Sequence, residues 1–234
     1  GGGGGLEIAA GLETGEVSVI GVEGAEGREL QRLSDRKKEV TDIKYSPDAS
    51  RLAVGCKDKA IDVYAFSSDG KWERFATCKG HSSGVSHLDW SGCGGWLQTL
   101  DSGYELLFWQ IPQQPGSKVA EVKPHPKAAD LAGVGWESVT CPIGWSVMGV
   151  FEGGADGSDV NAVDRSPDRS FILSSDDSGK VNLIKYPAVE KLTPPKKAMG
   201  GHSSHVTNVR VSGSGKYAIS TGGADLSVFI WAIK

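Results

Sequence analysis

The sequence predicts an all-β fold, a β-propeller with WD-type repeats, on three observations. Glycine accounts for 33 of 234 residues, about twice its usual share, which indicates many tight turns. Apolar and polar residues alternate in short runs, and helical spacing is not sustained over about ten residues anywhere. A turn followed by two such runs recurs at an interval near 45 residues, which is typical of a four-stranded propeller blade.

The interval is measured between the large residues that end the third run of each unit. These residues are Ile20, Tyr64, Trp109, Ile184 and Trp231, and their separations are 44, 45, 75 and 47 residues. One interval therefore carries an insertion of about 30 residues. After a flexible glycine segment at residues 1–5, we predict five blades at about residues 6–38, 39–80, 81–124, 125–200 with the insertion, and 201–234.

The second unit shows the order of elements within a blade. Polar or glycine-containing turns separate four short strands, which we predict at residues 40–45, 52–55, 61–64 and 72–78. By the same pattern the first unit begins in its second strand and the last unit ends after its third, so both are incomplete. Because an open sheet edge favours aggregation, we expect at least one further blade upstream in the natural protein.

Two related segments, "GHSSGVSHLDWS" at residues 80–91 and "GHSSHVTNVRVS" at residues 201–212, lie where two blades begin. In a WD-type blade, a His before the first strand, a Ser or Thr in the second, an Asp in the next turn and a Trp ending the third can form a buried hydrogen-bonded network. The last blade carries the whole set, which we predict to be His202, Thr221, Asp225 and Trp231.

The third blade carries only part of this set, namely His81, Thr99 and Trp109. Gly103 stands at the Asp position and the nearest acid is Asp101, so we expect this network to be open or rerouted rather than formed. On that basis Asp225→Ala should destabilise the protein much more than Asp101→Ala. The other three blades lack the set, and we expect them to be held by apolar packing.

Several segments run in the same order as in one known family. They include "SGYELLFW", "TCPIGWSVMGVFEGGADGSDVNAVDRS" and "ISTGGADLSVFIW". Together they resemble the carboxy-terminal propeller of the echinoderm microtubule-associated protein-like family, and the resemblance covers roughly residues 6–234. It extends to the long insertion before "DVNAVD", which generic WD repeats lack.

This resemblance implies a non-catalytic module that interacts with the cytoskeleton. Members of the family carry two joined atypical propellers that bind soluble tubulin, and attachment to microtubules needs an amino-terminal region. We therefore expect tubulin or microtubules as the partner, a cytoplasmic and cytoskeletal location, and an upstream propeller in the same chain. The alternative is a general WD-repeat scaffold that recruits a different protein partner.

The loops that lead into each blade and the turns between second and third strands should lie on one face and contact the partner. The candidate residues on them are Lys37, Lys38, Lys57, Ser83, Tyr104, Asp156 and His205. The basic clusters at residues 35–39 and 194–197 are either solvated loops or cationic patches for an acidic partner. The apolar segment at residues 135–151 either forms extra strands packed on the propeller or exposes Trp136 or Trp145 as an anchor.

Other functions are disfavoured by composition and motifs. A net charge of −4 and a pI of about 5.8 argue against nucleic acid, and no apolar stretch approaches the roughly 20 residues of a membrane span. We find no catalytic motif or phosphate loop and expect no cofactor. The His202–His205 spacing and the Asp-rich loop at residues 153–159 lack full ligand sets, so we expect no metal. The four cysteines are expected to be small buried residues in a reducing compartment.

Overall fold

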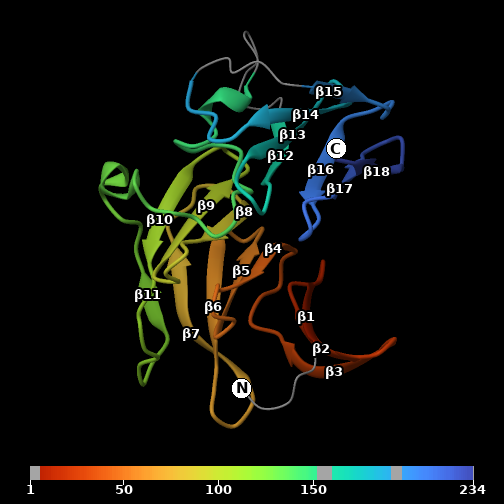
Figure 1. Cartoon of the computed structure of the whole chain (residues 1–234). Coiled ribbons are helices and arrows are strands. Elements are labelled where there is room, and N and C mark those ends of the chain that lie inside the picture. Colours follow the sequence, from red (N-terminus) through yellow and green to blue (C-terminus); the bar gives the residue numbers. More distant parts are fainter. Residues whose placement is uncertain (1–5, 152–159, 191–196, 234) are drawn as a thin grey trace. The chain divides into compact units, whose positions relative to one another are not determined.

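The computed structural model describes residues 6–151, 160–190 and 197–233, and it divides into two compact units, residues 1–137 and 138–234. Both units consist of small twisted sheets of short strands, joined almost throughout by antiparallel pairing (Figure 1). Within the described residues, no helix is both long and apolar enough to cross a membrane.

Unit 1 contains three sheets. The first has the order β1–β2–β3, with strands β1 (Leu6–Gly11), β2 (Val17–Glu23) and β3 (Glu26–Leu33). The second has the order β11–β7–β6–β5–β4, with strands β4 (Val40–Tyr45), β5 (Arg51–Cys56), β6 (Ala60–Phe66), β7 (Trp72–Lys79) and β11 (Ala120–Val122). The third has the order β10–β9–β8, with strands β8 (Val85–Trp90), β9 (Trp96–Asp101) and β10 (Leu106–Gln110).

Unit 2 contains two sheets. The fourth sheet follows the order of the chain, with strands β12 (Val160–Arg165), β13 (Phe171–Asp176), β14 (Lys180–Lys185) and β15 (Lys197–Gly200). The fifth does the same, with strands β16 (Val206–Val211), β17 (Tyr217–Gly222) and β18 (Val228–Ala232). Two short 3₁₀ helices lie in the long connection before β12, η1 (Ala128–Leu131) in unit 1 and η2 (Met148–Val150) in unit 2.

Neighbouring sheets pack face to face through alternate residues of their strands. On β5, Leu52 and Val54 join a cluster with β2 of the first sheet, whereas Ala53 joins a cluster with Leu88 and Trp90 of the third. In unit 2, Leu173 and its neighbours pack in the same way on β16 and β17. The side-chain period of two therefore gives the second sheet two buried faces. Each fully buried aliphatic side chain contributes about 1.5–3 kcal/mol.

The turns repeat as regularly as the strands. Between the first and second strands, φ is positive at Ala49, Gly94, Arg169 and Gly215. Between the second and third strands of a blade, φ is positive at Gly15, Lys59, Tyr104, Gly179 and Leu226. Gly15 lies between β1 and β2, which correspond to the second and third strands of the first blade. Since these values range from 50° to 91°, the fold imposes a left-handed residue at two fixed positions, and five residues other than glycine accept it.

The fourth strand that we expected for the third blade is missing from the third sheet. The candidate segment, β11, instead pairs in parallel with β7 at the edge of the second sheet, with Ala120 opposite Ala76 (Figure 1). Pro112 and Pro115 precede it and have no backbone N–H to donate to a ladder beside β10. The chain meets β10 only later, where the N–H of His125 donates to the carbonyl of Phe108 (2.7 Å).

The prediction that the insertion adds β-strands is wrong for its described part. Residues 135–151 hold η2 and one isolated bridge, between Ser91 and Trp136. Glycines and a proline divide the segment into short runs, and its apolar side chains are buried from irregular backbone.

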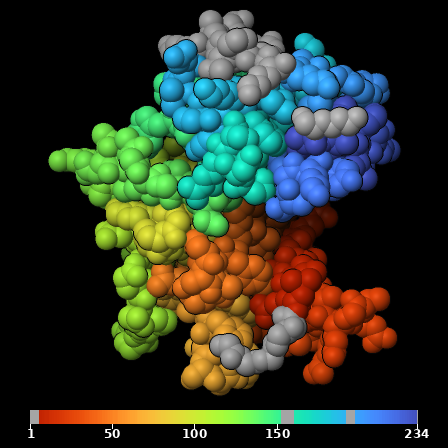
Figure 2. Space-filling view, in the orientation of Figure 1, coloured from red at the N-terminus to blue at the C-terminus, as the bar shows by residue number. Residues whose placement is uncertain are grey.

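The β2–β3 hairpin projects from the body of unit 1 (Figure 2, orange-red), and residues 23–30 are exposed.

The cysteines follow the prediction with one correction. Cys56, Cys78 and Cys141 are buried and free, as small apolar residues are. Cys93 is exposed, so the prediction is wrong for that residue. It occupies the tight turn between β8 and β9, where its Sγ atom lies 3.3 Å from Oγ of Ser91.

Candidate functional site

The buried network of the fifth sheet centres on one hydroxyl group. Ser220 Oγ lies 2.8 Å from Nε2 of His202 and accepts a hydrogen bond from Nε1 of Trp231 (2.8 Å). On the other side of the imidazole, Nδ1 lies 2.9 Å from Oδ2 of Asp225. The prediction of Thr221 is wrong, since its hydroxyl faces Thr207 instead (3.1 Å).

The reason for this error is the turn before β18. Trp231 lies 11 positions after Ser220, whereas Trp109 lies 10 positions after Thr99 in the third sheet. Counting back four positions from Asp225 therefore stops at Thr221, one residue short of Ser220. Successive strand residues point to opposite faces, and a shift by one residue exchanges a buried hydroxyl for a more exposed one.

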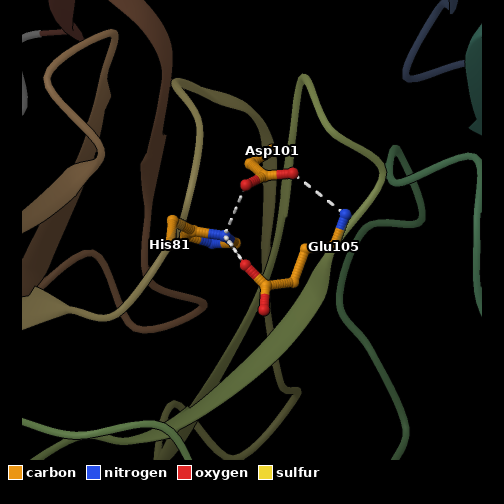
Figure 3. A group of neighbouring side chains, drawn as sticks. All are labelled: His81, Asp101 and Glu105. Carbon is orange, nitrogen blue, oxygen red and sulfur yellow. Dashed lines mark hydrogen bonds and ion pairs between the residues drawn. The ribbon is translucent and has the colours of Figure 1, made fainter.

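The third sheet forms the His–Thr–Trp part of its network, and only the acid departs from the pattern, so the expectation of an open or rerouted network is confirmed at the acid and wrong for the other three residues. His81 Nε2 lies 2.6 Å from Oγ1 of Thr99, which accepts a hydrogen bond from Nε1 of Trp109 (2.7 Å). The acid is rerouted: Oδ2 of Asp101 lies 3.4 Å from Nδ1 of His81, and Oε2 of Glu105 lies 3.8 Å from the same atom (Figure 3).

Asp101 also organises the adjoining loops. Its carboxylate accepts hydrogen bonds of 2.9 Å from the backbone N–H groups of Ser83, Gly103 and Glu105. Asp225 similarly accepts from Ser203 and Ser227. A much larger effect of Asp225→Ala than of Asp101→Ala is therefore no longer expected.

In the fifth sheet, an acid at the end of the second strand and an acid in the turn that follows exclude each other. Gly222 ends β17 as Asp101 ends β9, and a Cβ atom at Gly222 would lie 1.7 Å from Oδ1 of Asp225. In the third sheet, a Cβ atom at Gly103 would in turn lie 3.3 Å from Oδ1 of Asp101. A blade can thus supply its carboxylate from the end of its second strand, as Asp101 does, or from the turn that follows, as Asp225 does. The position that does not supply the acid is then occupied by glycine or has a glycine close to it.

Ionisation in the two networks follows from burial and hydrogen bonding. Burial lowers the pKa of His81, although Asp101 and Glu105 act in the opposite direction, so the imidazole is neutral near pH 7. Burial opposes ionisation of Asp225, but hydrogen bonds from Ser227 and His202 lower its pKa to about 2. Burial likewise opposes ionisation of Asp101, but hydrogen bonds from backbone N–H groups outweigh it and lower the pKa of Asp101, so the carboxylates of both networks are ionised at neutral pH.

In the second sheet an ionic network occupies the equivalent place. Arg36 stands four residues before β4, as His81 stands four before β8, and its guanidinium bonds both oxygens of Asp62 (2.5 and 2.6 Å). The Asp62 side chain is fully buried, and Asp58 also pairs with Arg36 (3.1 Å). The expectation of purely apolar packing is wrong for this sheet. The pKa of Arg36 is raised chiefly by Asp62.

Five segments of unit 1 form a continuous row, which we call the turn surface: residues 12–16, 34–39, 57–59, 81–84 and 102–105. A Cβ atom at Gly15 would lie 2.7 Å from the carbonyl oxygen of Lys38, and the N–H of Lys57 donates to the carbonyl of Glu39 (2.9 Å). A Cβ atom at Gly84 would lie 3.1 Å from Cα of Lys57. The Oγ atoms of Ser83 and Ser102 are 2.6 Å apart.

The turn surface brings together all the candidate partner residues that the sequence places in unit 1, except Trp136. Lys37 and Lys38 are exposed, and neither has an ion pair among the described residues. Lys57 pairs with Glu39, Ser83 is half-buried, and Tyr104 is 44% exposed with φ of 64°. The sequence reasoning missed Lys59, which is exposed in the same turn as Lys57.

The remaining candidates are dispersed. Trp136 is buried, only 8% exposed, and packs against Phe108, so it is not an exposed anchor. Trp145 is half-buried. His205 pairs with Asp177 (3.0 Å), whereas His202 bonds Asp225, so the two histidines have separate partners. Asp156 and the Asp-rich loop at residues 153–159 lie outside the described residues.

Comparison with known proteins identifies the chain's family. The model for the echinoderm microtubule-associated protein second beta-propeller matches residues 3–233. The chain belongs to this family. Human echinoderm microtubule-associated protein-like 3 is 36% identical over 98% of the chain, and human echinoderm microtubule-associated protein-like 4 is 37% identical over 98%. Rat echinoderm microtubule-associated protein-like 2 is 36% identical over 98% of the chain.

The chain spans about a quarter of the length of the human relatives, 25% of protein-like 3 and 22% of protein-like 4. Among solved structures, a chain of the "Crystal Structure of Mitotic Checkpoint Complex" has a TM-score of 0.68 at 18% identity, over 97% of this chain and 73% of that one. This likeness shows the fold alone. Together the comparisons confirm the predicted WD-type β-propeller class and the family resemblance.

Proposed function

We propose that this chain is a non-catalytic interaction module that contributes to tubulin binding within a longer cytoplasmic protein of the microtubule cytoskeleton. Membership of a family of microtubule-associated proteins supports the proposal. The structural observation that carries it is the turn surface of unit 1, where three exposed lysines have no ion pair among the described residues, namely Lys37, Lys38 and Lys59.

The three lysines without ion pairs can attract an acidic partner although the chain as a whole carries a net charge of −4. Four acids of the turn surface are already paired: Glu39 with Lys57, Asp58 with Arg36, Glu16 with Arg32 and Asp35 with Arg74. Glu13 is exposed, and Glu105 lies beside His81. The unpaired lysines are thus left to attract acidic segments, and such attraction steers association and weakens with salt.

The turn surface is also held in place before any partner arrives. Arg36 anchors its loop to the buried Asp62, which leaves the two following lysines pointing outward. Gly15, with φ of 91°, packs closely on the backbone of the same loop. A prearranged surface loses less conformational entropy on binding than a mobile one.

The test uses the natural full-length protein and purified tubulin, analysed by co-migration in size exclusion at low and at physiological salt. A variant with Glu at the three unpaired lysines, K37E/K38E/K59E, should bind at least about tenfold more weakly at low salt. The matched control places the same three charge reversals on exposed lysines away from the turn surface: K71E/K118E/K127E. It should bind like the unmodified protein.

Each other outcome has a defined meaning. If both triple variants lose binding equally, charge matters but the turn surface is not the contact. If the full-length protein does not co-migrate with tubulin at low salt, the tubulin assignment is removed and the scaffold alternative remains. Residues 6–234 alone should bind weakly or not at all, because stable interfaces bury about 1,200–2,000 Å² and this chain would supply part of a tandem surface.

A further inference from the structure

One buried nitrogen in the third sheet has no hydrogen-bond partner: Nδ1 of His81. The His81 side chain is fully buried, and this atom faces Oδ2 of Asp101 at 3.4 Å and Oε2 of Glu105 at 3.8 Å (Figure 3). Neither approach has the geometry of a hydrogen bond. Buried polar atoms are nearly always satisfied, so this one calls for an explanation.

No placement of the protons gives Nδ1 of His81 a good hydrogen bond. Trp109 donates its N–H to Thr99 Oγ1, and one proton lies between that oxygen and Nε2 of His81. If the proton belongs to Thr99, then Nδ1 of His81 carries an N–H that is directed poorly at both carboxylates. If it belongs to Nε2, then Nδ1 presents a lone pair to two negative groups. A cation placed among the three groups satisfies all of them in the second case.

The fifth sheet provides an internal comparison. His202 occupies the same place in its blade, yet its Nδ1 is satisfied by Asp225 at 2.9 Å and by the hydroxyl of Ser227 at 3.0 Å. Ser227 stands four residues before Trp231, and Glu105 stands four residues before Trp109. The third sheet thus has a second carboxylate where the fifth has a hydroxyl, and its imidazole lacks the hydrogen bond.

We propose that His81, Asp101 and Glu105 bind a divalent transition-metal cation of the zinc type. They offer one imidazole nitrogen and two carboxylate oxygens, all within 4.8 Å of one another. Zinc binds such atoms at about 2.0–2.2 Å, so the carboxylate oxygens at 3.4 and 3.8 Å from Nδ1 of His81 need little movement for all three groups to coordinate it. The two carboxylates balance the charge of the cation.

The surroundings of the site suit this role. Ser82 donates from its N–H and its hydroxyl to Oε2 of Glu105, both at 3.2 Å, and its hydroxyl lies 3.5 Å from Oδ2 of Asp101. Thr99 fixes the ring of His81 from the opposite side. Such outer contacts orient ligands. Because the Glu105 side chain is 41% exposed, a cation can reach the site and water can complete its coordination.

The test is a zinc titration of the metal-free chain in competition with a chromogenic chelator. One equivalent of Zn²⁺ should bind with defined affinity, and Glu105→Gln should weaken it by at least about 10–100-fold. Co²⁺ in place of zinc should give the visible absorption bands of a four- or five-coordinate site, and these should vanish in E105Q. The melting temperature of metal-free E105Q should match that of the metal-free chain, because Glu105 is partly exposed.

The matched control is His205→Gln, which removes the exposed His205–Asp177 pair. This variant should keep full zinc affinity and the Co²⁺ spectrum. Equal zinc binding by the unmodified chain and E105Q would overturn the proposal. Binding that is lost in H205Q and retained in E105Q would overturn it too, by placing the ion at the surface pair.

Discussion

At the scale of single residues, the two imidazole networks depend on one hydroxyl each. Ser220 is fully buried and joins His202 to Trp231, so Ser220→Ala leaves Nε2 of His202 and Nε1 of Trp231 without this partner. We expect a loss of about 1–3 kcal/mol in the free energy of unfolding. Thr221→Ala is the control, because that hydroxyl bonds only at the surface, and it should change stability by about 0.5 kcal/mol or less.

Urea denaturation of the two variants checks this prediction. The result expected is a lower midpoint with an unchanged slope for S220A, and a midpoint close to that of the unmodified chain for T221A. A larger loss in T221A than in S220A would restore the assignment made from the sequence.

Asp48 provides a prediction about pH. Hydrogen bonds from the hydroxyls of Ser46 and Ser50 lower its pKa from 3.8 to about 2. The folded state favours the ionised form, so its stabilising effect is complete above pH 3.8 and is lost as pH falls through about 2. The amide in Asp48→Asn cannot ionise. The difference in urea midpoint between the unmodified chain and D48N should therefore be largest above pH 4 and shrink toward pH 2.

This comparison separates charge from shape, since an Asn side chain can still accept the turn's hydrogen bonds. A difference between the two proteins that is constant across the acid range would show that Asp48 acts through its hydrogen bonds alone. A difference that grows as the pH falls would contradict the lowered pKa.

At the scale of turns and strands, the positive-φ positions predict which substitutions stabilise the fold. Leu226 has φ of 50° and is 89% exposed, so Leu226→Gly removes strain and loses few contacts. We expect it to raise the free energy of unfolding by up to about 1 kcal/mol. Gly15→Ala should act in the opposite direction, because its Cβ would lie 2.7 Å from the carbonyl oxygen of Lys38. Melting temperatures of the two variants, measured side by side, give the signs directly.

The ionic network that joins the loop of Arg36 to β6 is a second element-scale feature. Arg36→Met leaves the fully buried carboxylate of Asp62 without its main partner, and we expect a loss of about 3–5 kcal/mol. Arg74 still approaches Asp62 at 3.4 Å, which places the loss toward the lower end. The double variant R36M/D62N should recover much of the stability, since the buried charge is gone.

Denaturant unfolding of the single and double variants completes this cycle. Losses in R36M and R36M/D62N that are equal would mean that the guanidinium acts through packing rather than by neutralising Asp62.

At the scale of the whole chain, each unit has a hydrophobic core of its own. Leu88 and Leu173 are fully buried in units 1 and 2, and replacing either by Ala should cost about 2–5 kcal/mol. We expect Leu88→Ala to accelerate amide hydrogen exchange mainly in β4–β10, and Leu173→Ala mainly in β12–β17. Peptide-resolved exchange measured by mass spectrometry distinguishes these outcomes. Equal acceleration in both units by either variant would show that the chain unfolds as one cooperative body.

The sequence was sufficient for features that depend on local order along the chain. The interval near 45 residues predicted the recurrence of short strands along the chain, and alternation predicted the four strands β4–β7 of the second sheet, because both follow from the geometry of a strand. It was insufficient where a distant residue decides the outcome, as for the pairing of β11 with β7 and the burial of Trp136. Two features of the sequence could have predicted these networks. Arg36 stands four residues before its strand, as His81 does, and Glu105 stands four residues before Trp109.

The mutual exclusion of the two acid positions restricts how such blades can diverge. Moving the acid of the fifth sheet from Asp225 to the strand end needs two substitutions, and neither is favourable alone. An acid introduced first at Gly222 would occupy the volume of the Asp225 carboxylate, since even its Cβ would lie 1.7 Å from Oδ1. Removing Asp225 first would strip the imidazole of its partner. The two substitutions are therefore epistatic, and lineages should keep one arrangement or the other while passing rarely between them.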